Sequence, residues 1–124
     1  MNGELKVKKR IYIEIGKILS ELNYSYLHIG TKLLLDCIYE VYKMEKIYDI
    51  NLENEVYPII SQKYKKSKLN IKCSINYATT QMYYNTNKRC LYNFFGFKII
   101  EKPKPKDIII EVIKKLNEYN SFEG

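Results

Sequence analysis

A cluster of lysine, serine and asparagine residues in the middle of the chain has the composition of a nucleic-acid-binding site. Five lysines and no acidic residue lie between Ser61 and Lys72. Lysine ammonium groups neutralise phosphates, and an asparagine side chain can form two hydrogen bonds with the edge of an adenine base. The candidate DNA-binding residues in this stretch are Lys65, Lys66, Ser67, Lys68, Asn70, Lys72, Cys73 and Asn76.

These residues divide into three chemical roles. The residues expected to neutralise phosphates are Lys65, Lys66, Lys68 and Lys72. Asn70 and Asn76 are expected to read bases, with adenine as the natural partner. Ser67 would cap a helix that begins after it and contact a phosphate. Cys73 lies between the two asparagines on the outward side of that helix, so we expect it to be partly exposed unless a partner covers it.

The residues that could support catalysis or bind a metal are few and scattered. The chain has no GxGxxG, P-loop, GxSxG or HExxH motif and only one histidine, His28. Asp36 and Glu40 are four residues apart, a spacing more typical of a solvated helix face than of paired catalytic acids. The three cysteines do not form a CxxC pair. We therefore expect no enzymatic activity, no metal site and no cofactor.

The charge distribution also points to an anionic partner. Residues 1–10 carry a net charge of +3, residues 11–55 carry −4 and residues 56–124 carry +8. Such asymmetry favours a polyanion as the partner of the C-terminal half. The alternative interpretation is a lysine-coated, solvated surface that binds nothing.

Length and hydropathy place the chain in a broad class. Its 124 residues, 46% hydrophobic and 28% charged, suit one globular domain. No apolar run reaches the roughly 18–20 residues that span a bilayer, and no signal peptide follows the polar N-terminus. We therefore expect a cytoplasmic protein without a membrane partner.

The elements that must position the candidate residues are predicted to be helices. Apolar residues recur at helical spacing along the chain, and no alternating strand pattern is found. The predicted helices cover about 5–22, 30–44, 52–64, 68–84, 88–95 and 107–119. Only residues 65–67 separate the third helix from the fourth, so these two helices are predicted to form a helix-turn-helix. In that motif the first turns of the second helix enter the major groove. The fold class is therefore all-α, a six-helix single domain.

The apolar stripes predict the core, and single residues predict the helix ends. The side chains expected in the core are Ile15, Leu19, Leu34, Ile38, Ile60, Ile75 and Val112. Ile29 and Ile59 are assigned to the same stripes, whereas Asp36 is assigned to the solvent side of its helix.

Four residues mark the predicted helix boundaries. Asn51 and Ser67 are candidate N-caps, Gly96 should end the fifth helix, and Asp107 should cap the last one. Pro58 should kink the third helix or begin its second part. Residues 97–106, which contain two prolines, are expected to be extended and basic.

The order of several short motifs resembles the C-terminal DNA-binding effector domain of stage-zero sporulation protein A, the sporulation response regulator. The resemblance runs from about Ile11 to Leu116 and includes Gly30 at the start of the second helix. The motifs are IYIEIGKILSELN at 11–23, IYEVY at 38–42, VYPIISQKY at 56–64, FFGF at 94–97 and a KP segment before the last helix. The resemblance implies an all-helical transcription factor that binds tandem DNA sites as a dimer and contacts RNA polymerase.

The chain departs from this family on the predicted recognition helix. The resemblance implies arginines where this chain has Asn70, Cys73 and Asn76, and a glutamate where it has Lys72. Arginine makes the strongest contacts with guanine, so the preferred DNA sequence should differ from that of the family.

Two functions therefore remain open. The first is a DNA-binding transcriptional regulator with altered specificity. The second is a protein-interaction module that keeps the fold and modulates a full-length regulator or RNA polymerase without sequence-specific DNA binding.

The expected domain organisation has three parts. They are a basic tail at residues 1–10, the effector-like domain at 11–119 and a C-terminal tail at 120–124. Because only about ten residues precede the effector-like region, we expect no receiver domain and no control by aspartyl phosphorylation within this chain.

Overall fold

The computed structural model describes residues 2–96 and 101–123, with side chains for 3–96 and 101–118. These residues form helices without any strand, so the predicted all-α class is confirmed. The helices are α1 (Asn2–Glu21), α2 (Ile29–Met44), a π-helical turn (Leu52–Val56), α3 (Tyr57–Tyr64), α4 (Lys68–Asn85), α5 (Lys88–Phe95) and α6 (Pro105–Glu123).

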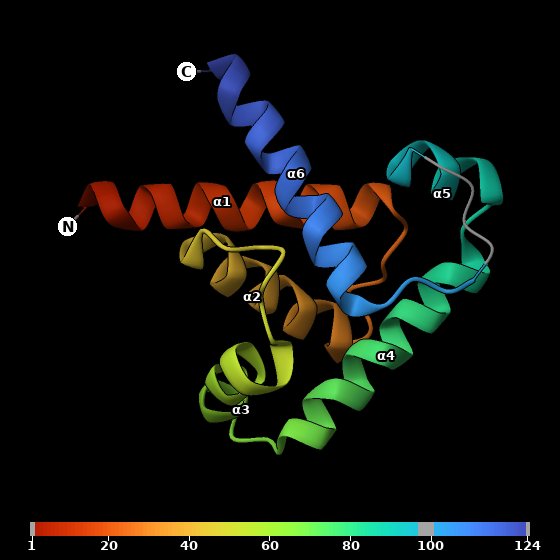
Figure 1. The fold of residues 1–124 in the computed structure, drawn as a ribbon, viewed down its shortest axis with the longest axis horizontal. Coiled ribbons are helices and arrows are strands. Elements are labelled where there is room, and N and C mark those ends of the chain that lie inside the picture. The colour runs from red at the N-terminus through yellow and green to blue at the C-terminus, as the bar shows by residue number, and fades with distance from the viewer. Residues whose placement is uncertain (1, 97–100, 124) are drawn as a thin grey trace.

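Helix α2 lies at the centre of the molecule. It contacts α1, α3, α4 and α6, and its most extensive contact is with α4 (Figure 1). The seven side chains predicted for the core are all buried, none with more than 1% of its surface exposed. The apolar stripes of separate helices therefore meet in one core, as helical periodicity predicts.

Three residues mark helix boundaries where the sequence predicted them. The side chain of Asn51 accepts a hydrogen bond from the backbone N–H of Asn54 at 3.1 Å, which begins the π-helical turn. Pro58 lies in the first turn of α3, where its missing N–H removes no helical hydrogen bond. Gly96 ends α5 with a φ of 75°, the left-handed conformation that glycine adopts without strain. These three predicted boundaries are confirmed.

Three of the side-chain assignments were wrong. Ile29 and Ile59 are exposed by 48% and 40%, because each lies roughly 100–110° around its helix from the buried side, at about 100° per residue. Asp36 was assigned to solvent but is only 4% exposed, because α3 packs over that side of α2. Helical periodicity does not reveal which side of a helix a neighbouring helix covers.

The outer helices are longer than the sequence suggested. Residues 2–10 were assigned to a basic tail, although the first helix was predicted from about residue 5. They are the first half of α1, because lysine, leucine and arginine favour the helix even beyond the core. Helix α6 begins at Pro105, two residues before Asp107, whose carboxylate accepts a hydrogen bond from the Lys104 N–H at 3.0 Å. Its backbone continues to Glu123, so the expected tail at 120–124 is helical as far as that residue. Residues 97–100 of the expected extended segment lie outside the described residues.

Gly30 permits the close approach of α2 and α4. A Cβ atom at this position would lie 1.9 Å from the backbone oxygen of Ser74 and 3.0 Å from the Cβ atom of Ala78. No side chain fits there, so glycine sets the distance between the two helices. This contact fixes the position of α4, which carries most of the candidate DNA-binding residues.

Candidate nucleic-acid interface

The connection between α3 and α4 is a tight turn held by Ser61. Its carbonyl oxygen accepts hydrogen bonds from the backbone N–H groups of Lys65 and Lys66, and its hydroxyl donates to the Lys66 carbonyl. Lys65 adopts a left-handed conformation with a φ of 55°. The side chain of Lys65 is exposed and that of Lys66 is partly exposed, so the turn presents both ammonium groups near the start of α4.

Ser67 caps the N-terminus of α4. Its hydroxyl oxygen accepts a hydrogen bond from the backbone N–H of Asn70 at 3.1 Å, which confirms the predicted cap. The first turn of α4 contains Lys68 and no acidic residue. The unpaired N–H groups and the helix dipole make such an end favourable for an anion, and Lys68 adds a full positive charge.

The outward face of α4 has an apolar centre. The buried face is formed by Ile71, Ile75, Ala78 and Met82. At about 100° per residue, Cys73 and Leu69 lie about 10° and 30° around the helix axis from the direction opposite to the middle of this buried face. Leu69 is 70% exposed, and the predicted exposure of Cys73 is confirmed. Leu69 was not among the candidate residues because an isolated leucine carries no polar signal.

The two asparagines flank this apolar centre on opposite sides. Asn76 is partly buried, and its backbone oxygen accepts a hydrogen bond from the Thr80 hydroxyl at 2.8 Å. Asn70 is exposed, and its side-chain oxygen lies 3.3 Å from the Ser74 hydroxyl that donates to it. Their side chains therefore border the outward face, which Leu69 and Cys73 occupy at its middle.

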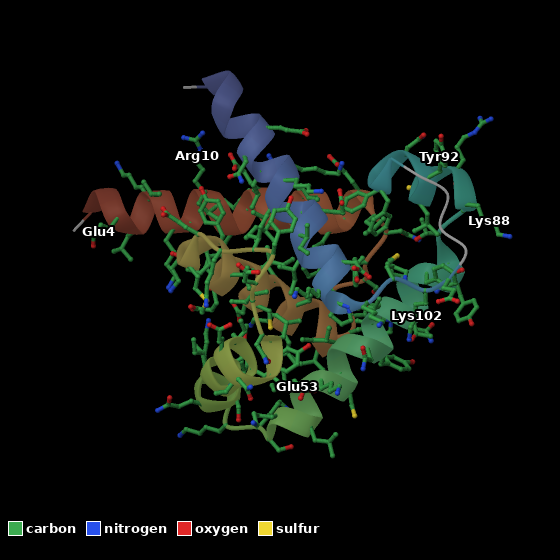
Figure 2. All side chains as sticks on the ribbon, in the orientation of Figure 1. Glu4, Arg10, Glu53, Lys88, Tyr92 and Lys102 are labelled. Carbon is green, nitrogen blue, oxygen red and sulfur yellow. The ribbon has the colours of Figure 1, made fainter. Side chains whose placement is uncertain are left out.

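Among the candidate DNA-binding residues, Lys72 forms an ion pair with an acid. Its Nζ lies 2.7 Å from the Oε1 atom of Glu53, which belongs to the π-helical turn before α3. The hydrogen bond and the charge of the partner lower the pKa of Glu53 and raise that of Lys72. In Figure 2, Glu53 lies between the ribbons of α3 and α4. Lys72 was expected to neutralise a phosphate, but in the structure its ammonium group is already paired with the Glu53 carboxylate.

Lys102 is a basic residue that the sequence did not place at this site. Its Nζ donates a hydrogen bond to the Thr80 hydroxyl at 2.8 Å, so the segment before α6 lies against the second half of α4 (Figure 2). About 12 residues of α4 separate Lys68 from Thr80, a rise of roughly 18 Å. The basic composition of residues 97–106 was visible in the sequence, but the contact of Lys102 with α4 is tertiary.

A buried carboxylate anchors α3 to the rest of the molecule. Asp36 of α2 accepts a hydrogen bond from the Tyr64 hydroxyl, and its Oδ1 lies 3.3 Å from the Nζ of Lys63. Burial and the contact with Asp36 raise the pKa of Tyr64, and they raise that of Tyr12 on α1 in the same way. The three helices therefore meet at Asp36, which holds the end of α3 and hence the turn that follows it.

The described part of the chain offers neither a cluster of metal ligands nor a helix that could span a membrane. Among the side chains that the structure describes, at residues 3–96 and 101–118, no three metal-binding groups lie close enough together to hold an ion. No helix in these ranges is long and apolar enough to cross a membrane.

Comparison with known proteins does not assign the chain to a family. No protein-family model matches the chain, and no curated protein matches it in sequence.

Proposed function

We propose that the protein is a non-catalytic, DNA-binding transcriptional regulator in which α3, the turn and α4 act as a helix-turn-helix. The observation that carries the proposal is the N-terminus of α4. It is capped by Ser67, free of acidic residues in its first turn, exposed on its outward face and preceded by Lys65 and Lys66. The resemblance to the sporulation regulator supports the same function, with the dimer on tandem sites and the RNA polymerase contact that it implies.

The chemistry follows from the placement of charge around α4. The N-terminal turns of α4 would enter the major groove, which is about 12 Å wide. Lys65, Lys66 and Lys68 would contact phosphates on one wall of the groove. Lys102, about 18 Å further along the helix, would contact the opposite wall. The centre of α4 would then face the base edges.

The dependence of binding on salt tests the proposal most directly. Each neutralised phosphate releases counterions, so a protein with about six phosphate contacts loses roughly a thousandfold in affinity between 50 and 200 mM salt. Fluorescence anisotropy with a mixed-sequence duplex would measure this dependence. An affinity for duplex DNA that does not change with salt would contradict the proposal.

A double substitution locates the binding face. Replacing both Lys65 and Lys66 with alanine should weaken binding to every duplex and reduce the salt slope by about 2. The matched control is Lys9→Ala with Lys17→Ala, which removes the same charge from exposed positions on α1. Figure 1 shows α1 on the other side of the molecule from the α3–α4 turn. Equal losses in the two double variants would mean that the turn is not the site.

The thiol of Cys73 provides a second test of the same geometry. Cys73 is exposed at the centre of the outward face, whereas Cys90 lies on α5 and is partly exposed. Excess duplex DNA should slow the alkylation of Cys73 and leave that of Cys90 unchanged. Mass spectrometry of the alkylated peptides measures both rates in one sample. If DNA leaves the Cys73 rate unchanged, α4 does not face the groove.

A protein-interaction module is the second candidate function. The observation that favours it is the set of exposed apolar side chains beside α4, where Leu27 is 95% exposed and Tyr77 is 56% exposed. The ring of His28, the residue after Leu27, meets the Tyr77 ring edge to face at 5.1 Å, so the segment before α2 lies against α4. This function predicts that Leu27→Ala and Tyr77→Ala weaken binding to a full-length sporulation regulator or RNA polymerase. It also predicts no salt-dependent binding to duplex DNA.

A further inference from the structure

The outward face of α4 carries an apolar centre between cationic ends, and this arrangement indicates the kind of base that it would read. Leu69, with 70% of its surface exposed, and the exposed Cys73 lie side by side at that centre. Lys68 and Lys65 precede them, and Lys102 lies beyond them at Thr80. An apolar strip between cations suits a polyanion that presents apolar groups, whereas an apolar protein surface would leave the lysines without partners.

Only one base edge in the major groove offers such a group. Thymine presents its 5-methyl group there, while guanine, cytosine and adenine present hydrogen-bond donors and acceptors. Leucine side chains gain free energy by removing apolar surface from water. A thymine methyl is therefore the group in the groove that an exposed leucine at the centre of α4 can contact favourably.

The rest of the face is consistent with A·T pairs. The two arginines of the chain, Arg10 and Arg89, lie on α1 and α5, so α4 has none for a bidentate contact with guanine. Asn70 and Asn76 border the centre, and asparagine is the side chain that pairs with adenine. In neighbouring A·T pairs, the asparagines would contact the adenines and the leucine would contact the thymine methyl groups.

We propose that Leu69, with Cys73 beside it, is a specificity-determining residue that contacts thymine 5-methyl groups, so that the preferred duplex carries thymines opposite the centre of α4. This inference rests on the proposed DNA-binding function. It names the sequence class that the same site reads.

The experiment begins with the selection of bound sequences from a random duplex pool. In the selected duplex each thymine is then replaced, one at a time, by deoxyuridine, which lacks only the 5-methyl group and pairs identically. At one or two positions this replacement should weaken binding roughly fourfold, the effect expected for one buried methyl group. Anisotropy titrations at a single salt concentration measure the change.

The protein variant connects this effect to Leu69. In Leu69→Ala the affinities for the thymine and deoxyuridine duplexes should be equal at those positions, because the variant has lost the group that contacts the methyl. The matched control is Leu5→Ala, another exposed leucine, on α1 at 65% exposure, which should keep the fourfold difference. Circular dichroism checks that both variants remain helical.

The outcomes separate this inference from the function on which it rests. Salt-dependent duplex binding with no deoxyuridine effect at any position overturns the thymine contact and leaves the DNA-binding function standing. A deoxyuridine effect that persists unchanged in Leu69→Ala overturns the role of Leu69. If no duplex binds at all, both proposals fail together.

Discussion

At the scale of single residues, the pairing of Lys72 with Glu53 bears most directly on DNA affinity. The two charges lie 2.7 Å apart at the proposed interface, so the carboxylate offsets a lysine that would otherwise attract phosphate. The acid also lies where a phosphate would approach Lys72. Glu53 should therefore limit the affinity of the face for DNA.

The substitution Glu53→Gln should raise the affinity for every duplex and make the salt slope steeper by about 0.9, the value for one added phosphate contact. Titrations at four salt concentrations measure the slope. The control, Glu4→Gln, makes the same charge change on an exposed residue of α1 and should leave the slope as it is (Figure 2). Lower affinity in Glu53→Gln would mean that the ion pair positions Lys72 for binding.

The role of Asn76 separates base reading from phosphate binding. Because it borders the outward face and is uncharged, Asn76→Ala should cost about 1–3 kcal/mol on a selected duplex and almost nothing on a scrambled one. Parallel titrations of the two duplexes measure the difference. Asn93→Ala, an exposed residue of α5, serves as the control. Equal losses on both duplexes would exclude direct reading by Asn76.

At the scale of secondary-structure elements, the contact between α2 and α4 depends on Gly30. In Gly30→Ala the new Cβ would meet the Ser74 backbone 1.9 Å away, and a backbone atom cannot move without shifting α4. We expect a loss of at least ~2 kcal/mol in the free energy of unfolding, measured by urea denaturation. The control is Gly3→Ala, which meets no atom within 4 Å and should be neutral or slightly stabilising. An unchanged stability in Gly30→Ala would contradict the packing.

Helix α3 depends in a similar way on Asp36. The substitution Asp36→Asn keeps the size of the side chain but removes the charge that faces Lys63 and accepts a hydrogen bond from Tyr64. We expect a loss of ~1–3 kcal/mol in the free energy of unfolding, since a hydrogen bond to a charged group contributes about that much. Asp49→Asn removes an exposed carboxylate and should change stability little. If Asp36→Asn left the free energy of unfolding unchanged, α3 would be held by its apolar contacts alone.

At the scale of the whole molecule, buried tyrosines predict how stability depends on alkaline pH. Burial, with smaller contributions from Cys37 and Glu53, raises the pKa of Tyr57 to about 12, and burial raises the pKa of Tyr24 as well. An unfolded tyrosine ionises near pH 10, so the unfolded chain releases these protons first. The stabilisation is therefore complete below about pH 10 and is lost as the pH rises toward 12.

Circular dichroism from pH 8 to 12, with tyrosinate absorbance read in the same samples, measures this loss. Tyr24 and Tyr57, whose pKa values are raised by burial, should ionise together with the loss of the helical signal. The substitution Tyr57→Phe removes one such proton and should make the decline less steep. Ionisation of all 13 tyrosines in one step while the helices persist would contradict the prediction.

The sequence by itself determined the helices, the boundaries at Asn51, Ser67 and Gly96, and most of the core. These features depend on neighbours within four residues: Ser67 caps the N–H three residues ahead, Gly96 adopts its own left-handed conformation, and apolar residues recur with the helical period. The three-residue turn between the third and fourth helices, with its lysines, was predicted correctly for the same reason.

Only the tertiary structure decided which sides of the helices are covered and which charges meet. Asp36 is buried because α3 covers it, and Lys72 meets Glu53 from 19 residues away. Lys102 reaches Thr80, 22 residues before it in the chain. Ion pairs and hydrogen bonds act over a few ångströms in space, and spacing along the chain does not specify which distant residues come that close. The helical period places Leu69 on the outward face of α4, but only the tertiary structure shows that Leu69 stays 70% exposed there.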